Sequence, residues 1–590
     1  MTRSTLRLLL ASVVAGLALF VAACGGSDSG SSTSSSSGGG ASNQETGQGK
    51  TGGVLKQLGS SDVDYLDPGH TYYTAGFQVL YPTQRTLYSF KPTDGTKPVP
   101  DLAAGEPQIS DDLKTITVKI KPGVKFSPPV NRAVTSKDVK YAFDRFFSAN
   151  VGGQYTSYFN SIEGAPSTPS KGVKSISGIT TPDDQTIVFK LSKPLAVGVA
   201  SALVMPVSAP VPEEYAKKFD AKNPSTYNTH VVATGPYMVK NDAQGNTVGY
   251  QAGKSIDLVR NPNWDKSTDY RPAYLDEIQL TTNEADASIS AQQVLTGSHS
   301  ALDTNPPAAQ LKDVVTSRKG QFAQLPGGGY RYFPLNTTIK PLDNINVRKA
   351  IVAAFDRDAA LKARGGKFTG DIPTHFLPPG IPGFEEAGGM AGPGFDFLKN
   401  PRGDMTVATN YMKKAGYPSG KYTGNAKLLL VAANADPGKA QAEVAKAQLE
   451  KLGFKITFRT VPQDAVYTEW CQVPKKQVAI CGSAGWFKDF TDPQSMLEVT
   501  FKGANISKEG GNNNLAQLDD PKIDAAMDKA AGLQGDARNK AWAEIDKMIT
   551  GDAPAVPFDW DKTTIIWSKD VQGVGNPYYD ALDFSFTSLK

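Results

Sequence analysis

The alternation of apolar and polar residues along the chain predicts both strands and helices. Residues 114–120 alternate as a half-buried strand does, after an Asp-rich turn. Residues 135–145 begin with polar residues and then place apolar residues at helical spacing. Residues 441–452 have a helical pattern that ends at Gly453, and a strand pattern follows over residues 454–461. Such an alternation of elements is typical of an α/β protein.

A short apolar stretch near the C-terminal end leads directly into two acids. Residues 478–480 are typical of a buried strand, and the strand pattern at 485–487 is followed by Asp489 and Asp492. Pro493 suits the first turn of a helix. Each acid could cap that helix, because Asp is a favoured N-cap residue, or hold a cationic ligand, because ligand sites collect at strand ends. The local sequence leaves both interpretations open.

The first 23 residues have the pattern of a secretory signal peptide. Arg3 and Arg7 precede the apolar run 8–23, which is short for a membrane span. The small residues before Cys24 resemble the lipobox of bacterial lipoproteins, which implies cleavage before Cys24 and a lipid on its thiol. The alternative is an ordinary signal peptide with a chance cysteine. Residues 24–51 are rich in Gly and Ser and predict a flexible tether.

The length and the charge of the chain limit the number of lobes and the kinds of partner that we expect. A chain of 590 residues is longer than one hydrophobic core usually supports, even without its first 23 residues, so we expect at least two lobes. The formal net charge is +4 without a run of basic residues, which argues against nucleic acid as a partner. No second long apolar stretch follows the first. We therefore expect a monomer that is soluble apart from its lipid anchor, on the outer face of the cytoplasmic membrane.

Two cysteines remain if Cys24 carries a lipid. Cys471 and Cys481 are ten residues apart and flank a turn at residues 473–476. Outside the cytoplasm such a pair is normally oxidised, so we expect a disulfide. A metal or redox pair is the alternative, but the spacing matches neither a CxxC motif nor a zinc site.

Aromatic residues cluster early in the globular part. Phe77, Tyr81 and Tyr88 are expected in the core. Tyr72 and Tyr73 lie beside a polar loop, so they are candidates for a cleft as well as for the core.

The motifs of common enzyme classes lack required residues in this chain. His299 stands where a nucleophile elbow needs serine, and Phe368 stands where a phosphate loop needs a hydroxyl group for magnesium. The four histidines are widely separated, so no local zinc motif exists. His70, beside the Tyr72 loop, remains a candidate contact for a metal or chelate. We predict a protein that is not an enzyme and has no cofactor and no metal site.

A series of short motifs gives a more specific indication. In chain order they are residues 99–103 (VPDLA), 122–126 (PGVKF), 138–145 (DVKYAFDR), 233–237 (ATGPY), 259–264 (VRNPNW), 335–336 with 347–351, 414–418 (KAGYP) and 485–493 (GWFKDFTDP). In this order they resemble the family 5 extracellular solute-binding proteins, which serve ABC importers of peptides, nickel and related solutes. Two segments depart from the family pattern: residues 127–132 replace a glycine-bearing turn, and residues 488–490 read KDF instead of ADY.

The resemblance covers nearly all of residues 52–590 and implies two α/β lobes that close over a solute as a hinged clamp. It places two crossover strands near residues 327–330 and 554–557, where glycines and prolines suit such passages. The implied domains are lobe I, residues 52–328 with residues 556–590 returning to it, and lobe II, residues 329–555.

The resemblance implies a protein that delivers a solute to an ABC permease. A peptide is favoured as the solute, because the resemblance is strongest with peptide-binding members. A metal chelate, a sugar or an amine remains an alternative, as does a hydrolase or sensor on the same scaffold.

In peptide-binding relatives the acid that matches Asp489 pairs with the α-amino group of the ligand. The residues that match Gly485 and Phe487 present backbone groups to the extended peptide. Trp486 either adds a surface for the ligand or points into the core. Lys488 either points away from Asp489 or folds back and neutralises it. The other predicted ligand-binding residues are Tyr72, Tyr73 and Tyr330.

Overall fold

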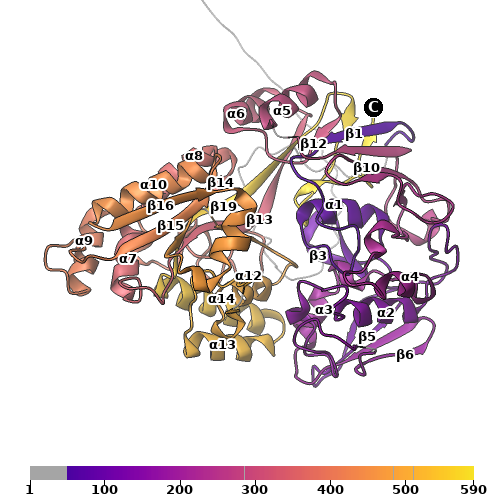
Figure 1. The fold of residues 1–590 in the computed structure, drawn as a ribbon, viewed down its shortest axis with the longest axis horizontal. Coiled ribbons are helices and arrows are strands. Elements are labelled where there is room, and N and C mark those ends of the chain that lie inside the picture. The colour runs from indigo at the N-terminus through magenta and orange to yellow at the C-terminus, as the bar shows by residue number, and fades with distance from the viewer. Residues whose placement is uncertain (1–48, 174, 285, 483, 509) are drawn as a thin grey trace, which may run out of the picture. The chain divides into compact units, whose positions relative to one another are not determined.

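The computed structural model describes residues 49–590 except residues 174, 285, 483 and 509 (Figure 1). The predicted signal peptide, Cys24 and the tether up to residue 48 lie outside these residues. Within the described chain, no helix combines the length and the apolar character that a membrane crossing requires. The described elements form a mixed α/β fold with two lobes, as the sequence predicts. We call the part built on strands β1 and β5 lobe I and the part built on strand β15 lobe II.

Lobe I contains two larger sheets and a hairpin. In the first sheet β1 pairs in parallel with β11 and β12, and β10 pairs antiparallel with β11. In the second sheet β5 (Thr115–Lys119) confirms the predicted strand, because Ile116 and Val118 are buried on one of its faces. The other strands are β1 (Val54–Leu58), β2 (Tyr88–Lys91), β3 (Asp94–Pro100), β4 (Gln108–Ile109), β6 (Ile179–Asp183), β7 (Thr186–Lys190), β8 (Tyr237–Val239), β9 (Tyr250–Gln251), β10 (Ser255–Arg260), β11 (Glu277–Thr281) and β12 (Ala301–Leu302). The helices are α1 (Thr74–Thr83), α2 (Ser136–Phe146), α3 (Ala196–Ala202), α4 (Glu213–Asp220), α5 (Ala287–Thr296) and α6 (Ala308–Ser317).

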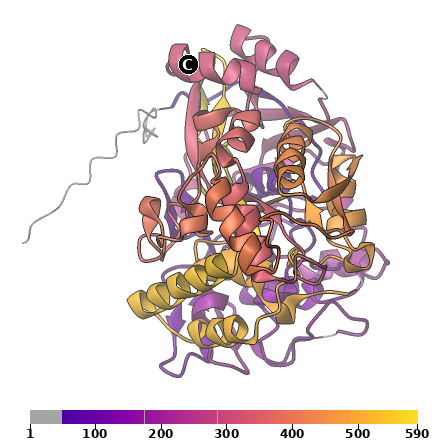
Figure 2. The ribbon, with the colours of Figure 1, turned by 90° about the vertical axis from the view of Figure 1, so that its left-hand side faces the viewer.

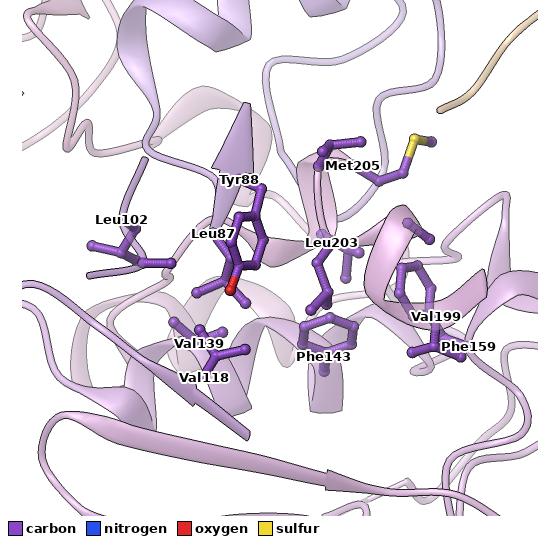
Figure 3. Packing of buried hydrophobic residues seen from close by; sticks show 14 of the residues in the cluster. Leu87, Tyr88, Leu102, Val118, Val139, Phe143, Phe159, Val199, Leu203 and Met205 are labelled. Atoms are coloured by element: carbon purple, nitrogen blue, oxygen red, sulfur yellow. The ribbon is translucent and has the colours of Figure 1, made fainter. Parts of the chain in front are cut away.

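The core beside β5 depends on the predicted helix, which is α2. A capping box of Thr135 and Asp138 starts this helix, and its apolar face buries Val139 and Phe143. Figure 3 shows these two side chains close to Val118 of β5 in one packed cluster. The same cluster contains the aromatic residues that the sequence assigns to the core, namely Phe77, Tyr81 and Tyr88.

Lobe II has a smaller parallel sheet, in which β15 lies between β16 and β17. The predicted helix at 441–452 is α10 (Gly438–Lys451), and the predicted strand at 454–461 is β16 (Lys455–Val461). Helices α12 (Pro493–Phe501), α13 (Pro521–Ala531) and α14 (Gly535–Asp552) pack together and share one core cluster (Figure 2). The remaining elements are β15 (Lys427–Ala433), β17 (Ile480–Cys481), α7 (Ile345–Ala354), α8 (Arg357–Arg364), α9 (Met405–Lys414) and the short α11 (Gln463–Ala465).

Two long antiparallel strands link the lobes. β13 (Phe322–Pro334) pairs with β19 (Ala555–Ile566), and β14 (Gly370–Asp371) and β18 (Ala484–Phe487) complete a sheet in the order β14-β19-β13-β18. The register of β13 and β19 is interrupted between Pro326 and Tyr330, where the predicted glycine segment lies. The backbone angle φ of Gly328 is +58°, a value that residues other than glycine rarely adopt. The residues of β19 that face this break are Trp560 to Lys562. The second crossover therefore lies further along the chain than the predicted residues 554–557, because Val556 and Phe558 still pack in the core of lobe II.

The chain after β19 packs on lobe I. Leu582 and Phe584 belong to the same core cluster as Leu55 of β1 and Ile278 of β11. Two small strand pairs shape this segment: β20 (Val571–Gln572) with β23 (Ser588–Leu589), and β21 (Gly575–Asn576) with β22 (Ala581–Leu582).

Candidate functional site

Strand β18 lies at the edge of the shared sheet and leaves one side open. Among the described strands only β13 pairs with it. An open strand edge carries unpaired backbone donors and acceptors and can bind an extended peptide as an additional strand. At one end of this edge the amide of Gly485 donates a hydrogen bond to the hydroxyl group of Tyr467 at 3.3 Å. At the other end the chain turns through residues 488–492, which include Asp489.

Asp489 is a buried acid that two tyrosines of lobe I hold. The residue is 7 % exposed. The hydroxyl group of Tyr72 donates to its Oδ2 at 3.0 Å, and the hydroxyl group of Tyr158 donates to the same oxygen. Among the residues that the structure describes, no lysine, arginine or histidine forms an ion pair with this carboxyl group. Its surroundings thus contain hydrogen-bond donors but no opposite charge.

Burial changes the acidity of Asp489. It raises the pKa of the carboxyl group from 3.8 to about 7, although the hydrogen bonds from Tyr158 and Tyr72 act to lower it. Burial also raises the pKa values of both tyrosines well above 10, so they remain neutral donors. At neutral pH the carboxyl group is therefore close to half ionised, and a bound ammonium group would favour the ionised form.

Asp492, the second acid of the predicted pair, has a structural role. Its side chain accepts a hydrogen bond from the amide of Gln494 at 2.8 Å and caps α12. It also forms a buried ion pair with Arg538 at 2.9 Å. For Asp492 the capping interpretation is confirmed, whereas Asp489 caps no helix in the described chain.

Lys488 points away from Asp489. Its Nζ donates to the carbonyl oxygen of Pro577 at 2.8 Å. Burial lowers the pKa of Lys488, and the charge of nearby Asp580 acts in the opposite direction. Lys488 thus belongs to a contact with the C-terminal segment and does not neutralise Asp489 in this structure.

The turn that carries Asp489 is inserted into lobe I. Phe490 is 1 % exposed and belongs to the lobe I cluster shown in part in Figure 3. Thr491 donates from its hydroxyl group to the carbonyl oxygen of Gly95 at 2.9 Å, and the hydroxyl group of Tyr578 donates to the carbonyl oxygen of Asp489 at 2.7 Å. These contacts join residues of both lobes around the acid.

The strand alternation of β18 separates the other predicted residues. Trp486 lies on the core side, where its Nε1 donates to the carbonyl oxygen of Ser495 at 2.8 Å. Gly485 and Phe487 lie on the opposite face, beside the side chain of Arg331. Tyr72 meets Asp489 directly, whereas Tyr73 is 57 % exposed at the start of α1.

Tyr330 lies in the core of lobe II. It is 0 % exposed, and its hydroxyl group donates to the carbonyl oxygen of Met496 at 3.1 Å. The neighbouring positions of β13 alternate, so Tyr332 shares this core and Arg331 points to the opposite face. We therefore leave Tyr330 out of the proposed site.

Sequence reasoning missed several residues around Asp489. Tyr158 and Tyr578 donate hydrogen bonds to Asp489 but come from distant parts of the chain. Phe490, the chain neighbour of Asp489, packs against Tyr158. For Tyr158, the only signal available was its place in a segment rich in aromatic residues, 155–159. Nothing in that segment links it to an acid 331 residues away.

The predicted disulfide is confirmed. Cys471 and Cys481 are bonded, with their Cα atoms 6.1 Å apart. The bond joins the helical segment that carries Tyr467 to β17, the strand that precedes β18. It thus helps to fix one end of the open edge.

His70, the candidate metal contact, stacks on the ring of Tyr65 with the ring centres 3.6 Å apart. No group of three or more His, Cys, Asp or Glu side chains suited to a metal ion occurs in the part of the chain that the structure describes.

A cavity of about 440 Å³ lies between the lobes next to Tyr158 and Phe490. Lobe I contributes Lys193 and Leu195, and lobe II contributes Glu498. Tyr158, which donates a hydrogen bond to Asp489, thus also lines this cavity.

Known proteins resemble this chain over most of its length. Residues 97–508 match the family model described as bacterial extracellular solute-binding proteins, family 5 middle. The chain is 27 % identical over 528 residues to heme-binding protein A of Haemophilus influenzae, with 87 % of each chain covered. It is 25 % identical over 505 residues to the dipeptide-binding protein of Pseudomonas aeruginosa, with 81 % of this chain and 84 % of the relative covered.

Solved structures show the same fold. The clavulanic acid biosynthesis oligopeptide binding protein 2 superposes with a TM-score of 0.79 at 25 % identity, over 93 % of this chain and 99 % of the other. The periplasmic binding protein DppA from Helicobacter pylori, in complex with the peptide STSA, superposes with a TM-score of 0.71 at 21 % identity, over 92 % and 98 % of the two chains.

Proposed function

The chain belongs to family 5 of the bacterial extracellular solute-binding proteins, and we propose that it captures peptides outside the cytoplasm and delivers them to the permease of an ABC importer. The dipeptide-binding relative and the oligopeptide-binding structure support a peptide as the solute. The family is one of solute-binding proteins, and we propose no catalytic activity for this chain.

Asp489 at the end of the open edge of β18 is the observation that carries the proposal. An ammonium group that is enclosed between two lobes loses its water and needs a fixed opposite charge. Hydrogen bonds to charged groups contribute about 1.5–3 kcal/mol. The peptide backbone would pair with the open edge of β18 at Phe487 and, in place of the Tyr467 hydroxyl group, at Gly485. The site would thus recognise the amino terminus and the extended backbone of the ligand.

Ligand binding closes the lobes about β13 and β19 in this proposal. The break in their register at residues 327–329 supports a hinge there, and we propose a lobe boundary at 328/329. The second boundary then lies near residues 560–562 and not at 555/556, because Val556 and Phe558 pack in the core of lobe II. The radius of gyration should decrease when ligand is added to protein stripped of bound solute. Small-angle scattering that shows no change at saturation would count against the hinge.

We also propose that the protein acts as a monomer and that a lipid on Cys24 anchors it to the outer face of the cytoplasmic membrane. The motif before Cys24 and the Gly- and Ser-rich segment after it support this assignment. A Cys24→Ala variant should be released or left unprocessed. If the variant is of mature length and still fractionates with membranes, the anchor assignment is wrong.

The identity of the solute can be tested on the protein as purified. Denaturation releases bound small molecules, and mass spectrometry identifies them. We expect peptides with free amino termini. A tetrapyrrole, a metal chelate, a sugar or an amine present in an amount equal to the protein would contradict the proposal. Recovery of cleaved products after incubation with a peptide would instead support a hydrolase.

A further inference from the structure

Arg331 brings a positive charge to the face of β18 that also carries Gly485 and Phe487. In the register of the sheet Arg331 lies opposite Gly485. A Cβ atom added to Gly485 would lie 2.9 Å from the Cζ atom of Arg331, so the arginine side chain occupies the space above this glycine. Its Cζ atom lies 4.7 Å from the centre of the Phe487 ring. The absence of a side chain at Gly485 therefore allows Arg331 to cross β18.

The guanidinium group of Arg331 is fixed by one contact and keeps its terminal nitrogens available. Its Nε donates to Oδ2 of Asp561 at 2.6 Å, and the side chain is 21 % exposed. Its two terminal nitrogens donate no hydrogen bond to any other residue that the structure describes. A guanidinium group fixed in this way matches the geometry of a carboxylate, which it can bind through two parallel hydrogen bonds.

Arg331 belongs to a cluster of charged side chains. Arg364 lies 3.1 Å from Asp559 and 3.0 Å from Asp561, so the group contains two arginines and two aspartates. Burial and the nearby charge of Asp561 raise the pKa of Asp559 well above its usual value, which favours its neutral form.

We propose that Arg331 binds a carboxylate group of the ligand, while Asp489 binds its ammonium group. This inference rests on the proposed function and makes it more specific. Gly485 and Asp489 are four residues apart, which corresponds to at most about 13 Å, since β18 ends at Phe487 and the chain then turns. An extended peptide of about three or four residues places its two termini at this separation. A longer peptide could place an acidic side chain at the same point.

The test is calorimetry with the mature protein after removal of bound solute. The probes are trialanine and tetraalanine, each as the free acid, as the C-terminal amide and in N-acetylated form. We expect amidation to weaken binding at least about tenfold in the wild type. In Arg331→Gln the free acid and the amide should bind equally, and Arg331→Lys should retain part of the difference. Arg402→Gln, which changes an exposed arginine, should behave as the wild type.

Each result has a distinct meaning. If the wild type binds acid and amide equally but still discriminates against the acetylated peptide, the role of Arg331 is refuted and the proposed function stands. If neither amidation nor acetylation changes binding, or no peptide binds, the proposed function fails as well. The amide of Ala-Ala-Ala-Glu separates the two sources of carboxylate: recovery of affinity assigns Arg331 to an acidic side chain, and no recovery assigns it to the C-terminus. Equal binding of acid and amide by the wild type would refute the role of Arg331 even if Arg331→Gln does not fold, and Arg331→Lys then serves as the second variant.

Discussion

The replacement of Asp489 by Asn should stabilise the ligand-free protein in a manner that depends on pH. Because the pKa of this carboxyl group is raised from 3.8 to about 7, the folded protein binds its proton more tightly than the unfolded chain does. The contribution of Asp489 to stability is therefore fully present below pH 3.8 and is lost as the pH rises through 7. The Asn side chain does not titrate, so the stability of the variant relative to the wild type increases with pH.

The magnitude follows from the two pKa values. The difference between a pKa of 3.8 in the unfolded chain and about 7 in the folded protein lowers the free energy of unfolding by about 4 kcal/mol when the pH is well above 7. Between pH 5 and pH 8 the free energy of unfolding of the wild type should fall by about 2–3 kcal/mol relative to that of Asp489→Asn. The carbonyl oxygen of Asn can still accept the hydrogen bonds from Tyr72 and Tyr158, but its buried amide group costs about 1–3 kcal/mol at every pH. The change with pH is thus the decisive quantity.

Urea-induced unfolding, followed by tryptophan fluorescence, measures this difference. The wild type, Asp489→Asn and the control Asp570→Asn, which alters an exposed aspartate, are compared at pH 5 and pH 8 after bound solute has been removed. We expect the stability of Asp489→Asn relative to the wild type to increase with pH, and that of the control to stay constant. Parallel pH profiles for the wild type and Asp489→Asn would refute the reasoning, because they would show that Asp489 is not a buried acid with a raised pKa.

Three other predictions follow from the same contacts. The affinity for a peptide with a free amino group should be greatest between about pH 7 and 8, since Asp489 is protonated below this range and the α-amino group loses its proton above it; calorimetry that finds equal affinity at pH 5 would disagree. Arg538→Gln should lower the free energy of unfolding by about 3–5 kcal/mol, because it leaves Asp492 buried without its partner; a loss below about 1 kcal/mol in urea unfolding would contradict this. Replacement of Cys471 and Cys481 by Ser should cost about 2–3 kcal/mol, and an unchanged urea midpoint would show that the bond does not stabilise the fold.

Local chemistry explains what the sequence alone could predict. The helix α2 and the strand β5 follow from the spacing of their own apolar residues, and the capping box of Thr135 and Asp138 marks the helix start. The cap formed by Asp492 likewise depends on residues next to it in the chain. The disulfide was predictable because only two cysteines remained after Cys24.

The surroundings of Asp489 depend on contacts that the sequence does not reveal. Tyr72 and Tyr158 reach it from positions 417 and 331 residues away. Tyr330 is predicted as a ligand-binding residue, yet the alternation of β13 directs it into the core and directs Arg331 to the opposite face. Long-range packing therefore decides which of two neighbouring residues can meet a ligand.

The central claim, that Asp489 binds the ammonium group of a peptide, is tested most directly by a thermodynamic cycle. Calorimetry measures the affinity of the wild type and of Asp489→Asn for one peptide, such as tetraalanine, and for its N-acetylated form. We predict that acetylation weakens binding to the wild type at least about tenfold, or roughly 1.4 kcal/mol, and has little effect on binding to Asp489→Asn. An equal effect of acetylation on both proteins would show that the amino group does not interact with Asp489 and would contradict the claim.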